Sequence, residues 1–195
     1  MIDGETGSPI WRLGGKHNQF TDLSDGNASK FGDQHHVRYW DGDMSQLTMF
    51  DNHELLLGQG CTANCSQGLH LQLDYDAKTV SVVSRHFHPE SMSSSAMGSY
   101  QKLPNSNVLL NWGMNPTFTQ HLPSGECVQD IQFSIWNGLV ADYRIFADSW
   151  VGYPTWDPVI ASKDGKVYVS WNGATEVKVW VLVRFLSQRT HNRSH

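Results

Sequence analysis

Hydrophobic residues recur at every second position in three separate stretches of the chain. The alternating positions are Leu69, Leu71 and Leu73, then Ile131, Phe133 and Ile135, and then Val177, Val179, Val181 and Val183. Successive side chains of a β-strand point to opposite faces, so a period of two predicts strands that each bury one face. No stretch shows the spacing of an amphipathic helix, and we therefore expect an all-β protein.

Short polar turns separate the apolar stretches. They are residues 41–43 (Asp-Gly-Asp), 104–107 (Pro-Asn-Ser-Asn), 123–125 (Pro-Ser-Gly) and 163–166 (Lys-Asp-Gly-Lys). Two of these turns lead into an apolar strand that ends at a tryptophan, Trp112 or Trp171. This pattern of a polar turn followed by an apolar strand recurs at an interval somewhat longer than the ~40–50 residues of known propeller repeats. The recurrence predicts four-stranded antiparallel blades joined by long loops.

The spacing of the turns predicts three blades, over residues 31–88, 98–148 and 159–186. Residues 10–15 read as the last strand of a preceding blade. We therefore expect a partial β-propeller domain over residues 1–186, followed by a polar tail at 187–195. Three blades do not close a ring and leave strand edges open, so the pattern predicts an incomplete chain.

Composition and charge narrow the possible partners. The chain has 195 residues, enough to bury the core of one domain. Its net charge is −5 and it has no run of Lys or Arg, which argues against nucleic acid or anionic membranes as partners. No apolar stretch is long enough to span a bilayer, and the first residues lack the apolar region of a signal peptide.

Cysteine and histidine pairs offer weak signals for metal binding. Cys61 and Cys65 can form a small disulfide, two free thiols or half of a metal site, and Cys127 stands alone. Because no second Cys/His pair has zinc spacing, we expect no metal site. His86 and His88 share a strand face, but no carboxylate motif accompanies them, which favours exposed or packed histidines.

The strongest chemical signal is the segment Gln34-His35-His36-Val37-Arg38, followed by Phe50-Asp51-Asn52. A guanidinium neutralises and orients oxyanions, and an imidazole can attack an electrophile or carry a proton. Arg38 lies three residues beyond His35, so on a regular strand the two point to opposite faces. They can share a site only if the segment bends. On such a strand His36 also points away from His35.

Taken together, seven segments resemble the arylsulfotransferase family, in the variant common in fungal genomes. They are residues 10–16 (IWRLGGK), 34–38 (QHHVR), 47–52 (LTMFDN), 98–105 (GSYQKLPN), 111–113 (NWG), 143–144 (YR) and 169–177 (VSWNGATEV). They follow the family order over most of the chain. His36 is a departure, because it stands where the fungal pattern has an acidic residue.

The resemblance implies a six-bladed β-propeller that transfers sulfate between phenols without a nucleotide donor and without a cofactor. It places the nucleophile, which forms a sulfohistidine, at His35. It also adds Ser95, at a position where threonine is usual, to the site. The remaining sulfate-binding residues of the family come from earlier blades. Aryl sulfates and phenols are the implied partners, and the family and the sequons at Asn27, Asn64 and Asn192 imply a secretory or extracellular location.

Two residues are added to the sulfate site from their chemistry. Arg38 is a supporting cation, and Arg144 is either a further anion contact or a member of a structural ion pair. The alternative function is a propeller that binds a ligand or protein without catalysis, because fold does not imply turnover. The two readings differ over whether His35 faces an anion-lined pocket.

Overall fold

The computed structural model describes residues 1–40, 42, 44–53, 66–136 and 138–183. Over these residues the protein is all-β, with strands β1 to β11 and no helix, as the alternating pattern predicts. No described helix could therefore cross a membrane. The chain divides into two compact units, Met1–Ala147 and Asp148–His195, which we describe separately.

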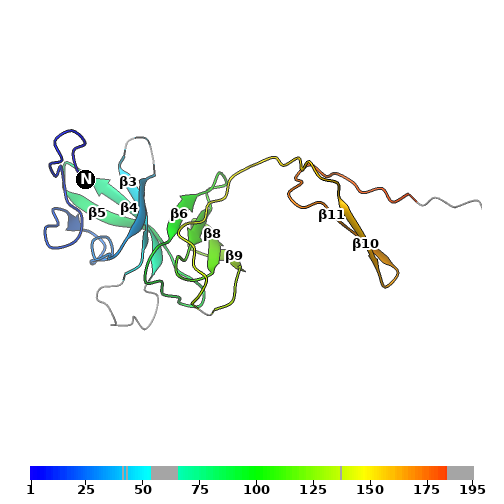
Figure 1. The fold of residues 1–195 in the computed structure, drawn as a ribbon. Coiled ribbons are helices and arrows are strands. Elements are labelled where there is room, and N and C mark those ends of the chain that lie inside the picture. Colours follow the sequence, from blue (N-terminus) through cyan, green and yellow to red (C-terminus); the bar gives the residue numbers. More distant parts are fainter. Residues whose placement is uncertain (41, 43, 54–65, 137, 184–195) are drawn as a thin grey trace, which may run out of the picture. The chain divides into compact units, whose positions relative to one another are not determined.

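The first sheet is a meander of antiparallel strands (Figure 1). Its strands are β1 (Thr21–Asp22), β2 (His35–Tyr39), β3 (Gln46–Asp51), β4 (Gln67–Asp74) and β5 (Thr79–His86). They lie in the order β1-β5-β4-β3-β2, and the short β1 adds to the outer edge in parallel with β5. The four strands β2 to β5 fall inside the predicted blade over residues 31–88.

The second sheet is a four-stranded antiparallel meander in the order β6-β7-β8-β9. Its strands are β6 (Ser99–Lys102), β7 (Val108–Asn111), β8 (Thr117–His121) and β9 (Cys127–Gln132). The predicted turns at residues 104–107 and 123–125 join β6 to β7 and β8 to β9. This sheet confirms the four-stranded blade predicted within residues 98–148, although no closed propeller ring is present among the described residues.

Each face of the first sheet packs against a different partner. Leu47 and Met49 of β3 belong to a cluster with the N-terminal segment, to which Trp11 and Phe20 contribute. The next residue, Phe50, points the other way and packs edge-on against Trp112, which directly follows β7 of the second sheet, at 5.3 Å between ring centroids. The period of two therefore places one hydrophobic core on each side of β3.

The two sheets approach each other closely at β4. A Cβ at Gly68 would lie 2.6 Å from Cδ2 of Leu110, which is fully buried. Only glycine leaves room for that leucine, so Gly68 sets the distance between the sheets. The same face of β4 carries His70, whose ring lies 4.3 Å from that of Trp40.

The second unit contains one described hairpin, formed by β10 (Val159–Lys163) and β11 (Lys166–Ser170). All ten of its strand residues are exposed. The predicted turn at residues 163–166 joins the two strands, and Trp171 follows β11 half-buried, with Nε1 donating to Trp156 O at 2.7 Å. Within the described part of the predicted blade over residues 159–186, only two strands are present.

Three predicted strands differ from the structure. Residues 177–183 and residues 10–15 form no ladder, because the alternating side chains there have no neighbouring strand with which the backbone pairs. Trp11 and Leu13 nevertheless pack on the first core. The strand that carries Ile131 ends at Gln132, which leaves Phe133 and Ile135 exposed.

Some expectations remain predictions. Cys61, Cys65 and the tail at 187–195 lie outside the described residues. Cys127 forms no disulfide with any described residue. A single domain over residues 1–186 also stays a prediction.

Candidate active site

An irregularity in the first strand of the meander sets the geometry of the site. Opposite β3, His35 pairs with Phe50 and Arg38 pairs with Thr48. Two residues of β2, His36 and Val37, therefore face the single residue Met49, which defines a β-bulge. His36 has a φ of +53°, in the left-handed region where histidine is one of the few tolerated residues besides glycine.

The bulge brings His35 and Arg38 to one face of the sheet. Residues paired across an antiparallel ladder have their side chains on the same side, and Phe50 and Thr48 are two apart, so they share a face. That face carries the ring of Phe50 toward the second sheet. His35 and Arg38 can lie on one face only if the segment bends, and the one extra residue of the bulge provides this bend.

The opposite face of β2 confirms this arrangement. Gln34 and Val37 line a cavity of about 490 Å³ together with Leu47 and Met49, on the side of the N-terminal segment. His35, His36 and Arg38 are absent from its lining. The two histidines and the arginine of the motif therefore lie on the face that meets the second sheet, and Gln34 lies on the other face.

The ring of His35 is held by three hydrogen bonds. Nδ1 lies 2.9 Å from Asp33 O and 2.8 Å from Asn52 Oδ1. Both partners are acceptors, so the hydrogen-bond network assigns the proton to Nδ1 and leaves a lone pair on Nε2. That lone pair accepts a bond from the Met97 backbone N–H at 3.2 Å.

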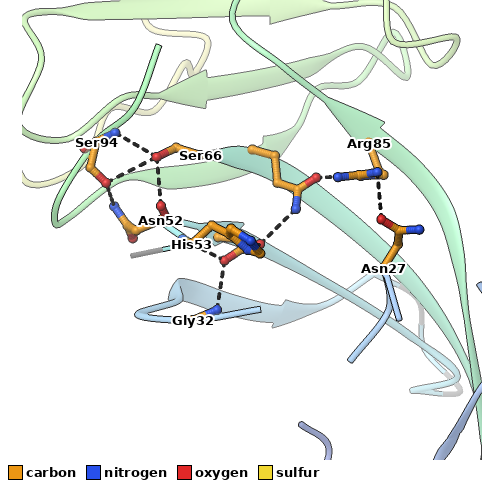
Figure 2. Close-up of polar contacts among 9 residues, drawn as sticks. Asn27, Gly32, Asn52, His53, Ser66, Arg85 and Ser94 are labelled. Carbon is orange, nitrogen blue, oxygen red and sulfur yellow. Dashed lines mark hydrogen bonds and ion pairs between the residues drawn. The ribbon is translucent and has the colours of Figure 1, made fainter. Parts of the chain in front are cut away.

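Asn52 connects His35 to the loop that precedes β6. Its Nδ2 donates to Ser94 O at 2.9 Å and to Met97 O at 3.1 Å. Ser66 Oγ also donates to Asn52 O at 3.0 Å and accepts from Ser94 N–H at 2.7 Å (Figure 2). Buried polar groups that are fully paired fix one conformation, so this network sets the position of Met97 over His35.

Ser94 and Ser95 have different surroundings. Ser94 is buried at 1% exposure, and its Oγ donates to Ala96 O at 3.0 Å. Ser95, the hydroxyl that the family pattern selects, is exposed in the same loop and has no hydrogen-bond partner among the described residues. The sequence motif Phe50-Asp51-Asn52 includes the amide of Asn52. Nothing in the run of serines indicated that Ser94 would be the buried serine.

The buried carboxylate of Asp51 stabilises the end of β3. Asp51 is fully buried and accepts hydrogen bonds from Gly32 N–H at 3.0 Å, His53 N–H at 2.9 Å and Gln67 Nε2 at 2.8 Å. Gln67 in turn accepts from Nε of Arg85 at 2.7 Å (Figure 2). These contacts tie the ends of β3, β4 and β5 together, so Asp51 is a structural support of the site.

His36 lies close enough to two cations to feel the charge of each. Its Nδ1 is 3.0 Å from Tyr100 O, and its ring lies 5.1 Å from that of Phe146. The pKa of His36 is lowered, first by burial and then by the positive charges of Arg38 and Arg144. Both guanidinium groups therefore act on the same imidazole.

Within the described ranges, Arg38 and Arg144 have no acidic partner. Arg38 is exposed and donates to Val37 O at 2.7 Å, and Arg144 stacks on the ring of Tyr143 with its guanidinium carbon 4.7 Å from the centroid. Among the described residues neither forms a salt bridge, and Nε of Arg144 is buried without a hydrogen-bond partner. The structural ion pair considered for Arg144 is therefore not seen in the described part of the chain.

Arg144 reaches the site because its segment runs along the edge strand of the second sheet. Tyr143 O accepts from Gly98 N–H at 3.2 Å, and Ile145 N–H donates to Ser99 Oγ at 3.3 Å. The bulge and this segment together place two imidazoles and two guanidinium groups at the junction of the sheets. The two guanidinium groups suit an oxyanion bound next to a nucleophilic imidazole.

Comparison with known proteins yields one positive result. The family described as "Arylsulfotransferase (ASST)" matches residues 1–134, which include the five-stranded first sheet, the four-stranded second sheet and the motif around His35. Neither the curated proteins nor the solved structures contain a match to the chain. The family match covers more than half of the chain, and the protein therefore belongs to the arylsulfotransferase family.

Proposed function

We propose that the protein transfers sulfate from an aryl sulfate to a phenol through a sulfohistidine at His35. The observation that supports this most directly is the bulge in β2, which places His35 and Arg38 on one face. A neutral imidazole is a competent nucleophile near neutral pH, and the hydrogen bonds at Nδ1 keep Nε2 as the lone-pair nitrogen.

In the first half-reaction, Nε2 of His35 attacks the sulfur and the bond from sulfur to the aryl oxygen breaks. The aryl oxide leaves with the electron pair. Asn52 Oδ1 and Asp33 O stabilise the positive charge that develops on the ring, because both accept from Nδ1–H. Arg38 and Arg144 neutralise the sulfuryl oxygens, and Ser95 is a further hydroxyl contact from the exposed loop.

The backbone N–H of Met97 has to move before the reaction can start. It donates a hydrogen bond to Nε2 of His35 at 3.2 Å, so the sulfuryl group must displace it before Nε2 can attack. Once displaced, the N–H is beside the sulfur and can donate to a non-bridging oxygen. This is the arrangement of an oxyanion-binding backbone amide.

The same hydrogen bond favours the second candidate function, a non-catalytic propeller that binds an anionic ligand or protein. If the Met97 N–H stays on Nε2, the imidazole is a structural group and the arginines alone hold the anion. The two functions differ in whether a covalent intermediate forms.

The test uses the chain with p-nitrophenyl sulfate as donor and phenol as acceptor. We expect release of p-nitrophenol, and we expect His35→Ala to abolish it. The matched control is His17→Ala, since His17 is exposed and lines the cavity on the other face of β2. Unchanged release by the His35→Ala variant would remove the nucleophile assignment.

A further inference from the structure

The second histidine of the motif has no part in the first half-reaction, yet the bulge places it at the same junction. His36 is the first bulge residue, and its Nδ1 lies 3.0 Å from the carbonyl of Tyr100 on β6. The backbone N–H of Tyr100 lies 3.3 Å from the same ring nitrogen. The contact with the carbonyl is the shorter of the two and forms only if Nδ1 carries the proton, so it assigns the lone pair to Nε2. No described residue hydrogen-bonds to that nitrogen.

Burial and the nearby charges favour the neutral form of the His36 imidazole. Burial is the first cause of its lowered pKa, and the charges of Arg38 and Arg144 are the next two. A neutral imidazole can accept a proton from a hydroxyl group. The same two guanidinium charges favour an oxide over a phenol at the same place, so they assist the loss of a phenolic proton.

The two half-reactions differ in their need for a base. In the first, the leaving aryl oxide departs as an anion and needs no proton removed. In the second, a neutral phenol attacks, and its proton must go to an acceptor. Nε2 of His35 cannot take this proton, because in the intermediate it is bonded to sulfur.

We propose that His36 is the general base that activates the acceptor phenol, an inference that rests on the proposed sulfate transfer. As the phenol oxygen bonds to sulfur, its O–H proton moves to Nε2 of His36. The bond from sulfur to Nε2 of His35 breaks, and its electron pair returns to that nitrogen. The proton then leaves His36 to solvent, which restores both neutral rings.

Two substitutions test the role without loss of the bulge. Asparagine and glycine both tolerate the left-handed backbone that His36 adopts at φ +53°, so His36→Asn and His36→Gly keep the strand geometry. Rapid mixing with p-nitrophenyl sulfate alone measures the first half-reaction as a stoichiometric burst of p-nitrophenol. The decay of the intermediate with added phenol measures the second.

For both variants we expect the burst rate and amplitude of the wild type, with transfer to phenol slowed about 10²-fold or more, the range of general-base contributions. Acidic phenols that are already ionised should recover much of the lost rate. Added imidazole should speed transfer by His36→Gly in proportion to its concentration, because the glycine leaves space for it.

The outcomes separate the two proposals. If the variants transfer sulfate to phenol at the wild-type rate, His36 is not the base, and sulfate transfer itself stands. If the variants lose the burst as well, His36 supports the fold of the site and the inference is wrong. If the wild type gives no burst, the sulfohistidine and the base role both fail.

Discussion

Acidification should destabilise the junction of the two sheets, because buried histidines face each other there. His86 at the end of β5 and His121 on β8 are both fully buried, with ring centroids 5.4 Å apart. His86 Nε2 lies 3.1 Å from Ser84 Oγ and 3.4 Å from the hydroxyl of Tyr100 on β6. Its Nδ1 has no hydrogen-bond partner among the described residues, so a proton there would be buried and unpaired.

The sign of the effect follows from the pKa of His86. Burial, and then the charges of His121 and His70, lower this pKa from 6.5 to about 4. The folded protein therefore resists a proton that the unfolded chain accepts between these pH values. Stability is complete above about pH 6.5 and falls as the pH drops toward 4. At pH 5 the loss from His86 alone is about 2 kcal/mol of unfolding free energy relative to neutral pH.

Neighbouring groups act in both directions. The pKa values of His121 and His88 are lowered chiefly by burial, which adds to the loss at acid pH. Asp130 on β9 opposes this for both, as does Glu90 for His88, because their negative charges favour the protonated rings. Burial also raises the pKa of Asp142, which adds stability as the pH falls. A variant of His86 isolates its share from these contributions.

The assay is urea unfolding at pH 7 and pH 5, followed by the fluorescence of tryptophan. The variant is His86→Gln, whose amide can still bond Ser84 but does not titrate in this range. We expect the wild type to lose about 2 kcal/mol more than the variant between the two pH values. Equal losses in the two proteins would refute the assignment of a low pKa to a buried, unpaired imidazole.

Three further changes test the architecture of the site. Asn52→Ala should slow the burst with p-nitrophenyl sulfate, because the ring of His35 loses the Oδ1 contact at 2.8 Å; an unchanged burst would show that Asp33 O orients the ring alone. Gly68→Ala should cost about 1–3 kcal/mol in a urea titration, since its Cβ would overlap Leu110, and no loss would mean that the sheets separate easily. Asp51→Asn should lower the unfolding free energy by about 1–3 kcal/mol, because the amide cannot accept all the bonds that the carboxylate accepts; unchanged stability would exclude Asp51 as a support.

The sequence predicted those features of the fold that depend on local pattern. Alternation identified the buried face of β4 through Leu69, Leu71 and Leu73, and the polar turns identified the hairpins of the second sheet. The alternation at residues 177–183 predicted a strand that does not form, because a strand needs a neighbour to pair with and the pattern does not identify one. Periodicity reports which side chains share a face only once pairing exists.

The bulge in β2, on which the candidate site depends, could not be predicted from the local sequence pattern. Nothing in the residues from Gln34 to Arg38 marks His36 as a bulge, since the bulge is defined by the register of β2 against β3. A regular strand would place His35 and His36 on opposite faces. Instead His35 contacts the loop before β6 and His36 contacts Tyr100 on β6, so both lie on the side of the second sheet. The placement of Arg144 likewise depends on a segment that pairs with the edge of β6.

The most direct test of sulfate transfer at this junction is to trap the intermediate. The chain is mixed with p-nitrophenyl sulfate without acceptor, quenched in alkali to preserve a bond between nitrogen and sulfur, and digested for mass mapping. We predict one sulfuryl group on His35, absent from the His35→Ala variant and removed by added phenol. Release of p-nitrophenol with no modification at His35, or with the sulfuryl group on another residue, would contradict the account.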